Sequence, residues 1–304
     1  MNLKGLHIEL TNKCYLKCSK CARTTFIDKF GIDKWDNHDL SLNDLKTFLD
    51  IDLSGMRIVL CGVYGDPIYH PELIEIVTWL KEKKAVVKIE TNGSYKDRAW
   101  WEELVSKLTA DDEICFSIDG LPENFTQYRV NGDWESIDIG LQVVGSSNVY
   151  SVWKYILFGF NEHNIEQTEA LAKSYNIKFF KLIHSNRFSD ENDNLLPSKT
   201  PTVGSQYTSV IHWKNLDNLA RVEQEIDPKC SSGKEHYITA DGYYLPCCYV
   251  GDWRFYYKSK FYKNKNSYKI QDTTIEKILD QEQDFFDNLK TTKPDYCRFN
   301  CPTL

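Results

Sequence analysis

The sequence has no apolar run approaching the roughly 20 residues that a helix needs to span a bilayer. Its first ten residues also lack a basic stretch followed by an apolar one, so they give no sign of a secretory signal. Positive charge is scarce, because 37 Lys and Arg stand against 44 Asp and Glu. A net charge of −7 and a pI near 5.6 predict no broad surface for a polyanion. We therefore expect a cytoplasmic protein with no nucleic-acid or membrane partner.

The chain of 304 residues is long enough for one large domain and a smaller one. Up to about residue 185, short apolar runs alternate with amphipathic helical patterns, which is typical of repeated βα units with a parallel sheet. Strands are expected at 6–10, 56–62, 86–91, 113–119, 150–158 and 178–183, and helices after Ser41, from Pro71, and over 99–108, 134–143 and 165–175. The sequence thus predicts an α/β fold.

The pattern changes after a segment, 185–203, that is rich in Asn, Asp, Ser and Pro and that we interpret as a loop. We place a first domain at 1–203 and a second at 204–304. The second domain is expected to contain strands 236–240 and 243–245 around an Asp241-Gly242 hairpin turn, and a helix from a Thr273/Glu276 capping box to about Leu289.

Ten cysteines in a chain without a secretion signal indicate metal sites or free thiols rather than disulfides. Cys14, Cys18 and Cys21 closely follow the first expected strand, where a loop can gather three thiolates around one point. No fourth Cys or His lies nearby in the sequence, and an open ligand position is what cofactor chemistry requires. Zinc or unliganded thiols remain the alternative. Cys61 and Cys115 lie in apolar segments and are interpreted as buried thiols.

The run Cys14-Tyr-Leu-Lys-Cys18-Ser-Lys-Cys21 resembles the CxxxCxxC signature of the radical SAM superfamily, although Lys20 replaces the aromatic or large apolar residue that is frequent there. Further segments are similar to the family's S-adenosylmethionine (SAM) contacts: Gly62-Val-Tyr64-Gly65-Asp66-Pro67 for the methionyl amino group, with Asp66 in place of the usual Glu, Asn92 after the third strand, Ser117 and Asp119 for the ribose, and Arg129 for the carboxylate. These segments follow successive expected strands, and βα barrels place their active sites at that edge. The resemblance implies a partial (β/α)6 TIM-like barrel in which the three cysteines hold a [4Fe-4S] cluster that binds SAM.

The second group of cysteines resembles an auxiliary-cluster region. Cys230, Gly242 and Cys247 are similar in spacing to the opening of the SPASM and twitch extensions of this superfamily. The resemblance implies an auxiliary [4Fe-4S] cluster held by Cys230, Cys247, Cys297 and Cys301 on a small hairpin-plus-helix domain. Five cysteines fit the single-cluster twitch form better than the seven of a full SPASM domain. Cys248 could replace Cys247, serve the substrate or fill space, and zinc in an all-thiolate shell is the alternative.

The resemblance also implies a reaction. SAM would be cleaved reductively to a 5′-deoxyadenosyl radical that abstracts hydrogen from a substrate, with an external flavodoxin- or ferredoxin-like reductant as partner. We expect net oxidation of a small polar molecule, such as a sugar, an aminocyclitol or a nucleoside-like compound, because the motif begins at residue 14 and leaves no room before it for a leader-binding domain. Modification of a peptide or protein side chain is the alternative, and a non-catalytic iron-sulfur or zinc protein is the second.

No catalytic acid or base is assigned. His184, near the end of the sixth expected strand, could face the active site or simply pack. The loop 186–200, which contains Asp190, Glu191 and Asp193, could recognise substrate or be merely solvated.

Overall fold

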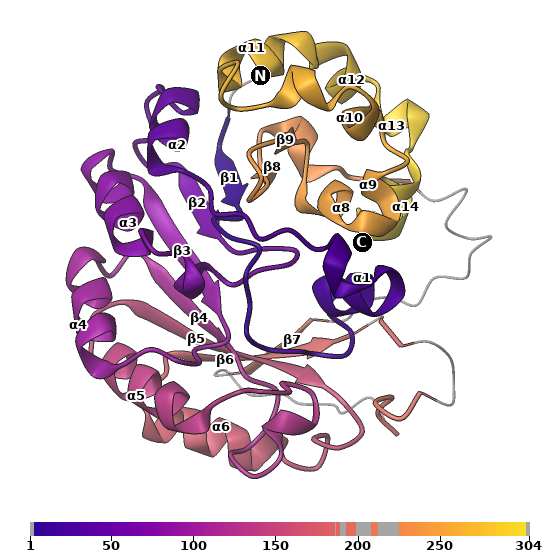
Figure 1. Cartoon of the computed structure of the whole chain (residues 1–304). Coiled ribbons are helices and arrows are strands. Elements are labelled where there is room, and N and C mark those ends of the chain that lie inside the picture. The colour runs from indigo at the N-terminus through magenta and orange to yellow at the C-terminus, as the bar shows by residue number, and fades with distance from the viewer. Residues whose placement is uncertain (1–2, 186, 189–192, 199–207, 212–224, 302–304) are drawn as a thin grey trace. The chain divides into compact units, whose positions relative to one another are not determined.

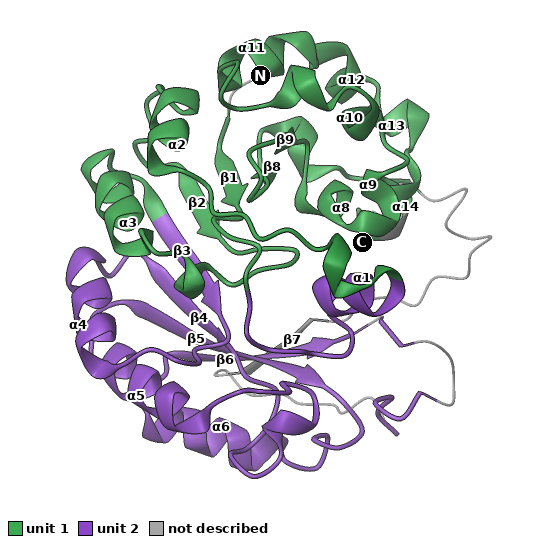
Figure 2. Ribbon diagram, in the orientation of Figure 1, with its two compact units in different colours: residues 1–13, 30–86, 216–304 green, residues 14–29, 87–215 purple. Residues whose placement is uncertain are grey.

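The computed structural model describes residues 3–185, 187–188, 193–198, 208–211 and 225–301 (Figure 1). The chain forms two compact units, which Figure 2 shows in green and purple. The first unit comprises 1–13, 30–86 and 216–304, and the second comprises 14–29 and 87–215. The predicted domain boundary at 203 lies outside the described residues and stays a prediction.

The second unit contains parallel strands in the order β7-β6-β5-β4-β3. Its strands are β3 (Val86–Thr91), β4 (Glu113–Ser117), β5 (Tyr150–Leu157), β6 (Phe179–His184) and β7 (Thr208–Ile211). Its helices are α1 (Ala22–Phe30), α4 (Arg98–Lys107), α5 (Trp134–Gly145) and α6 (Ile165–Ser174), with a 3-10 turn η3 (Phe125–Gln127). The predicted parallel α/β fold, similar to a partial TIM barrel, is confirmed, and β7 is an addition to it.

Aromatic packing fixes which face of this sheet the helices cover. Trp101 of α4 lies 5.4 Å from the ring of Phe116 on β4, and Trp134 of α5 lies 6.3 Å from Trp153 on β5. Gly140 makes room on α5, because a Cβ there would come within 2.8 Å of the Trp101 ring. Successive strand residues point to opposite faces, so the neighbours of Phe116 and Trp153 point away from the helices.

The first unit contains the parallel strands β2-β1-β8, followed by β9 antiparallel to β8. Its strands are β1 (Gly5–Ile8), β2 (Arg57–Leu60), β8 (His236–Ile238) and β9 (Tyr244–Leu245). Its helices are α2 (Leu42–Phe48), α3 (Leu73–Glu82), α8 (Cys248–Gly251), α9 (Trp253–Tyr256), α10 (Lys260–Lys263), α11 (Ile275–Gln281), α12 (Gln283–Asp287), α13 (Leu289–Thr292) and α14 (Asp295–Asn300), with 3-10 turns η1 (Ile32–Lys34), η2 (Pro67–Tyr69), η4 (Lys229–Ser232) and η5 (Lys265–Tyr268). The predicted hairpin is present, but its loop is longer than expected. The Thr239 N–H donates to the Tyr243 carbonyl at 2.9 Å, so three residues, 240–242, form the loop instead of Asp241 and Gly242 alone. Gly242 has the left-handed φ of 81° that favours glycine there.

Two features of the first unit differ from the sequence interpretation. The helix expected from Thr273 to Leu289 is broken into α11, α12 and α13, and its cap is Thr274, whose side chain accepts the Lys277 N–H at 3.4 Å. Glu282, where the first break falls, accepts the Tyr268 hydroxyl hydrogen bond at 2.8 Å. The hairpin is also not separate, because β8 pairs with β1. Within the described ranges, no helix is both long and apolar enough to cross a membrane.

Candidate active site

The three amino-terminal cysteines converge on one apolar cluster in the second unit. Cys18 is buried in that cluster with Leu16, Tyr128, Phe158 and Leu195, and the half-buried Cys14 and Cys21 pack against it. The Cys21 N–H donates to the Cys18 carbonyl at 3.0 Å, and α1 begins at the next residue. The predicted strand-to-helix loop therefore directs all three thiols to the same surroundings.

Two side chains bring N–H donors to the sulfurs. Asn92 Nδ2 lies 3.8 Å from Cys14 Sγ, and Arg129 Nη1 lies 3.8 Å from Cys18 Sγ. Burial raises the pKa of Cys18 to about 11, and the positive charge of Arg129 opposes that rise. Such donors suit thiolates that ligate an iron-sulfur cluster, whose properties depend on hydrogen bonds to sulfur. Among the residues described, no three Cys, His, Asp or Glu side chains already stand at metal-binding separation.

Arg129 is also bound to Asp119, the predicted ribose contact. Its Nε and Nη2 atoms both lie 2.7 Å from Asp119 Oδ2, while Oδ1 accepts the Ile156 N–H at 2.6 Å. The Asp119 side chain is fully buried, and burial raises its pKa although Arg129 opposes the shift. Ser117 is half-buried at the end of β4. In this structure, residues predicted to contact different parts of SAM thus form one network reaching Cys18.

The predicted glycine-rich turn lies in the first unit and is held by a residue that the sequence analysis missed. Glu9 Oε1 accepts the Tyr64 and Gly65 N–H groups at 2.7 and 3.0 Å, and Glu9 Oε2 accepts the Tyr237 hydroxyl hydrogen bond at 2.6 Å. Burial raises the pKa of Glu9 to about 7. The available signal was a lone carboxylate in the strand-like run 6–10, whose other residues are apolar apart from His7.

The other members of the turn are equally constrained. A Cβ on Gly65 would lie 1.8 Å from the Thr11 carbonyl oxygen, so only glycine fits this close approach. Asp66 is buried, and its side chain accepts the Ile68 N–H at 3.2 Å. The Tyr64 hydroxyl donates to the Gly251 carbonyl at 2.8 Å. These contacts hold the backbone of the turn in place.

The carboxyl-terminal cysteines interact with one another in the first unit. Cys230 lies in η4, Cys247 caps α8, and Cys297 lies on α14 with Cys301 directly after it. The Cys297 thiol donates to Cys301, and the charges of Cys230 and Cys247 help to raise the pKa of Cys297 well above its usual range. Burial raises the pKa of Cys247 to about 12. The Asp227 N–H, three residues before Cys230, donates to the Cys301 carbonyl at 2.8 Å, so the segments that carry Cys230 and Cys301 are in contact.

Cys248 differs from Cys247 in its burial. Cys247 is buried at the N-cap of α8, whereas Cys248, the first residue of that helix, is half-buried. Cys230 and Cys297 are buried like Cys247, and Cys301 is half-buried.

Two weaker sequence candidates have definite places in the second unit. Asp193 forms an ion pair with Lys20, and its side chain is only 2% exposed, so it is not a solvated loop residue. Leu195 packs in the apolar cluster of the cysteine loop. Asp190 and Glu191 lie outside the described residues. His184 ends β6 and is half-buried.

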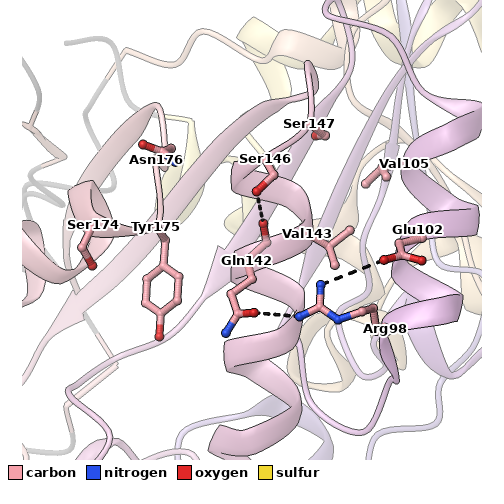
Figure 3. A pocket seen from close by; sticks show the side chains of 10 residues that line it. All are labelled: Arg98, Glu102, Val105, Gln142, Val143, Ser146, Ser147, Ser174, Tyr175 and Asn176. Atoms are coloured by element: carbon pink, nitrogen blue, oxygen red, sulfur yellow. Dashed lines mark hydrogen bonds and ion pairs between the residues drawn. The ribbon is translucent and has the colours of Figure 1, made fainter.

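A groove of about 550 Å³ lies elsewhere in the second unit, between α4, α5 and α6 and the turns that follow α5 and α6 (Figure 3). Arg98 points across it and donates to Gln142 Oε1 at 2.7 Å, with Glu102 at 4.0 Å. No predicted site residue lines this groove. Its charged groups already contact one another, so it is a poor candidate for the active site.

The family is established by a match to the profile of the "Radical SAM superfamily" over residues 8–174, more than half of the chain. The chain belongs to this superfamily, which implies a four-iron four-sulfur cluster and SAM.

Individual relatives have low sequence identity to this chain. The chain is similar to the GTP 3′,8-cyclase of Syntrophomonas wolfei, with 26% identity over 57% of this chain and 53% of that protein. It is also similar to the tungsten-containing aldehyde ferredoxin oxidoreductase cofactor-modifying protein of Pyrococcus furiosus, with 28% identity over 40% of this chain and 32% of that protein. The chain thus spans about a third to a half of the length of these relatives.

Solved structures agree in fold. Native anSMEcpe with bound AdoMet aligns with a TM-score of 0.60 at 15% identity, covering 98% of this chain and 88% of that one. SuiB of Streptococcus suis bound to S-adenosylmethionine aligns with a TM-score of 0.58 at 13% identity, covering 82% of this chain and 61% of that one. At these identities the likeness concerns the fold alone.

Proposed function

We propose that this enzyme cleaves SAM reductively and uses the resulting radical to oxidise a small polar substrate by two electrons. The observation that carries the proposal is the convergence of Cys14, Cys18 and Cys21 on one apolar cluster, with N–H donors beside two of the sulfurs. When bound, the cluster supplies the electron that breaks a carbon–sulfur bond of SAM.

The chain's own residues would bind and orient the cofactors. Cys14, Cys18 and Cys21 ligate the cluster, and the contacts to SAM are Tyr64, Gly65, Asp66, Asn92, Ser117, Asp119 and Arg129. Arg129 would hold Cys18 in position, since it is itself fixed by the buried Asp119. The apolar residues around the thiols exclude water, which protects a reactive intermediate from side reactions.

We further propose a twitch-like auxiliary [4Fe-4S] cluster at Cys230, Cys247, Cys297 and Cys301, which accepts the electron left on the substrate. Backbone hydrogen bonds support it: the Cys301 N–H donates to the Cys297 carbonyl, and the N–H of Asp227, three residues before Cys230, donates to the Cys301 carbonyl, both at 2.8 Å. A flavodoxin- or ferredoxin-like protein would supply the first electron. Peptide modification is the second candidate, supported by the likeness to SuiB, which has been solved with its precursor peptide SuiA (TM-score 0.57, 12% identity).

The test is anaerobic reconstitution followed by reduction with dithionite in the presence of SAM. We expect 5′-deoxyadenosine from the native chain and from Cys61→Ser, and none from Cys18→Ser. Cys61 is a matched control, because it is a half-buried thiol outside both cysteine groups. Persistent absence of 5′-deoxyadenosine from the fully loaded native chain would favour a non-catalytic iron-sulfur or zinc protein.

A further inference from the structure

A group of charged side chains lies on the helix-free face of the second unit's sheet. Lys88 on β3 contacts Glu90 at 2.9 Å and Glu113 of β4 at 3.0 Å, and Lys154 of β5 contacts Glu90 at 2.7 Å. The four side chains are 13% to 22% exposed. Because they alternate with residues such as Phe116 and Trp153, which contact α4 and α5, these charges point away from the helices.

Lys181 of β6 adds a third cation to this group. It is the register partner of Lys154, so the two side chains leave the sheet on the same face. Lys181 is half-buried, and burial together with the charges of Lys88 and Lys154 lowers its pKa. Among the residues that the structure describes, no carboxylate lies within 4.0 Å of its ammonium group. The group therefore carries three lysines against two glutamates.

Structural stability does not account for this arrangement. The interior of a complete βα barrel is filled mainly by Val, Ile and Leu, and replacing buried ion pairs by apolar residues often stabilises a protein. Lys181, which forms an ion pair with none of the described carboxylates, makes the arrangement costlier, because it places a third positive charge beside two others. A charged interior surface with an excess cation is instead what the binding of an anion requires.

Register also relates these lysines to the predicted SAM contacts. Lys154 is the register partner of Ser117, the residue predicted to contact the SAM ribose, and Lys181 continues that row on the next strand. The row thus begins at the carboxyl end of β4 and lies on the strand face opposite the helices. A substrate bound there would be adjacent to the nucleoside part of the cofactor.

We propose that Lys181, supported by Lys154 and Lys88, binds a carboxylate or phosphate group of the substrate. This inference rests on the proposed function and narrows its substrate class. Among small polar molecules, it favours a nucleotide or an acidic sugar over a cationic aminocyclitol, which the excess positive charge of the group would repel.

The test is labelling of the full reconstituted chain by pyridoxal 5′-phosphate, an anionic aldehyde that forms a Schiff base with unprotonated lysine, followed by borohydride reduction and peptide mapping. Uncharged pyridoxal is the matched probe, and Lys107, an exposed lysine on α4, is the internal control. We expect Lys181 to be labelled at about tenfold lower concentration by the phosphate than by pyridoxal, which corresponds to one close charge interaction of about 1.4 kcal/mol. Lys107 should show no such preference.

Two competitors identify the anion. Protection of Lys181 by inorganic phosphate but not by succinate assigns a phosphate group, and the reverse assigns a carboxylate. Equal labelling of Lys181 by the two aldehydes, labelling no stronger than that of Lys107, or no protection by either competitor would overturn the inference. The readout does not require SAM cleavage, so anion-selective labelling without 5′-deoxyadenosine would reject the proposed function and leave the anion site standing.

Discussion

Lys20 and Asp193 form a largely buried ion pair between residues 173 positions apart in the sequence. Lys20 stands inside the CxxxCxxC motif, where the superfamily often has an aromatic or large apolar residue, and it reaches the described segment 193–198 instead. The neighbouring Leu195 packs against the same cysteine loop. A polar residue in the motif is therefore used to attach a distant segment to the candidate cluster site.

The first prediction concerns this attachment. Asp193→Asn should lower the free energy of unfolding by about 1 to 3 kcal/mol, because a buried charge-assisted hydrogen bond is lost. It should also speed the transfer of cluster iron to a chelator. Asp272→Asn is the control, since Asp272 is 64% exposed and lies 3.7 Å from Lys269. Equal effects of the two substitutions in urea unfolding and iron-release assays would contradict the prediction.

The second prediction concerns Asp119 and Arg129. Asp119→Asn should destabilise the cluster-free chain by about 3 to 5 kcal/mol, because it leaves a buried guanidinium without its counter-charge. Arg129→Met should cost a similar amount, and the double variant should cost less than the sum of the two. Urea unfolding of the four proteins measures this coupling. Simple additivity would show that the pair does not act as a unit.

The third prediction concerns pH and Glu9. Its pKa is raised in the folded chain from about 4.5 to about 7, so the folded state binds this proton more tightly than the unfolded state does. Protonation of Glu9 therefore adds on the order of 3 kcal/mol to the free energy of unfolding below pH 4.5. This contribution is lost as the pH rises to 7. Glu9→Gln keeps an oxygen acceptor for the turn and removes the titration. The native chain should therefore lose stability relative to Glu9→Gln between pH 5 and 8. Parallel pH profiles in urea unfolding would reject this assignment.

The fourth prediction separates two adjacent cysteines. If the auxiliary cluster is present, Cys247→Ser should remove about four irons per reconstituted chain and Cys248→Ser should remove none. The reason is that Cys247, like Cys230 and Cys297, is buried, whereas Cys248 is half-buried. Iron and acid-labile sulfide analysis provides the measurement. Loss of iron from Cys248→Ser alone would identify Cys248 as the ligand. Zinc bound to these cysteines in the native chain would contradict the proposal of an auxiliary iron-sulfur cluster.

Local patterns were sufficient for much of the fold. The strand predicted at 86–91 coincides with β3, and the hairpin at Asp241-Gly242 is present with a left-handed glycine, because both signals are encoded by adjacent residues. The length of its loop, three residues instead of two, was not predicted. The capping residue Thr274 was misplaced by one position, since two consecutive threonines offer the same side-chain oxygen.

Long-range relationships could not be predicted in the same way. The alternation of Lys88 and Glu90 was visible in the sequence, but their grouping with Lys154 and Lys181 depends on which strands are neighbours. The role of Glu9 depends on a backbone turn 55 residues away and on a tyrosine 228 residues away. No local pattern links such positions.

The pairing of β1 with both β2 and β8 has a consequence for biosynthesis. Residues 5–8 leave the ribosome well before one of their two neighbouring strands, which begins at His236. Until then one edge of β1 has no partner, and Glu9 lacks the hydroxyl of Tyr237. The glycine-rich turn therefore acquires the Tyr237–Glu9 hydrogen bond only after residue 237 has been synthesised. A chain stalled before residue 236 would expose the unpaired edge of β1 to chaperones and to other nascent chains.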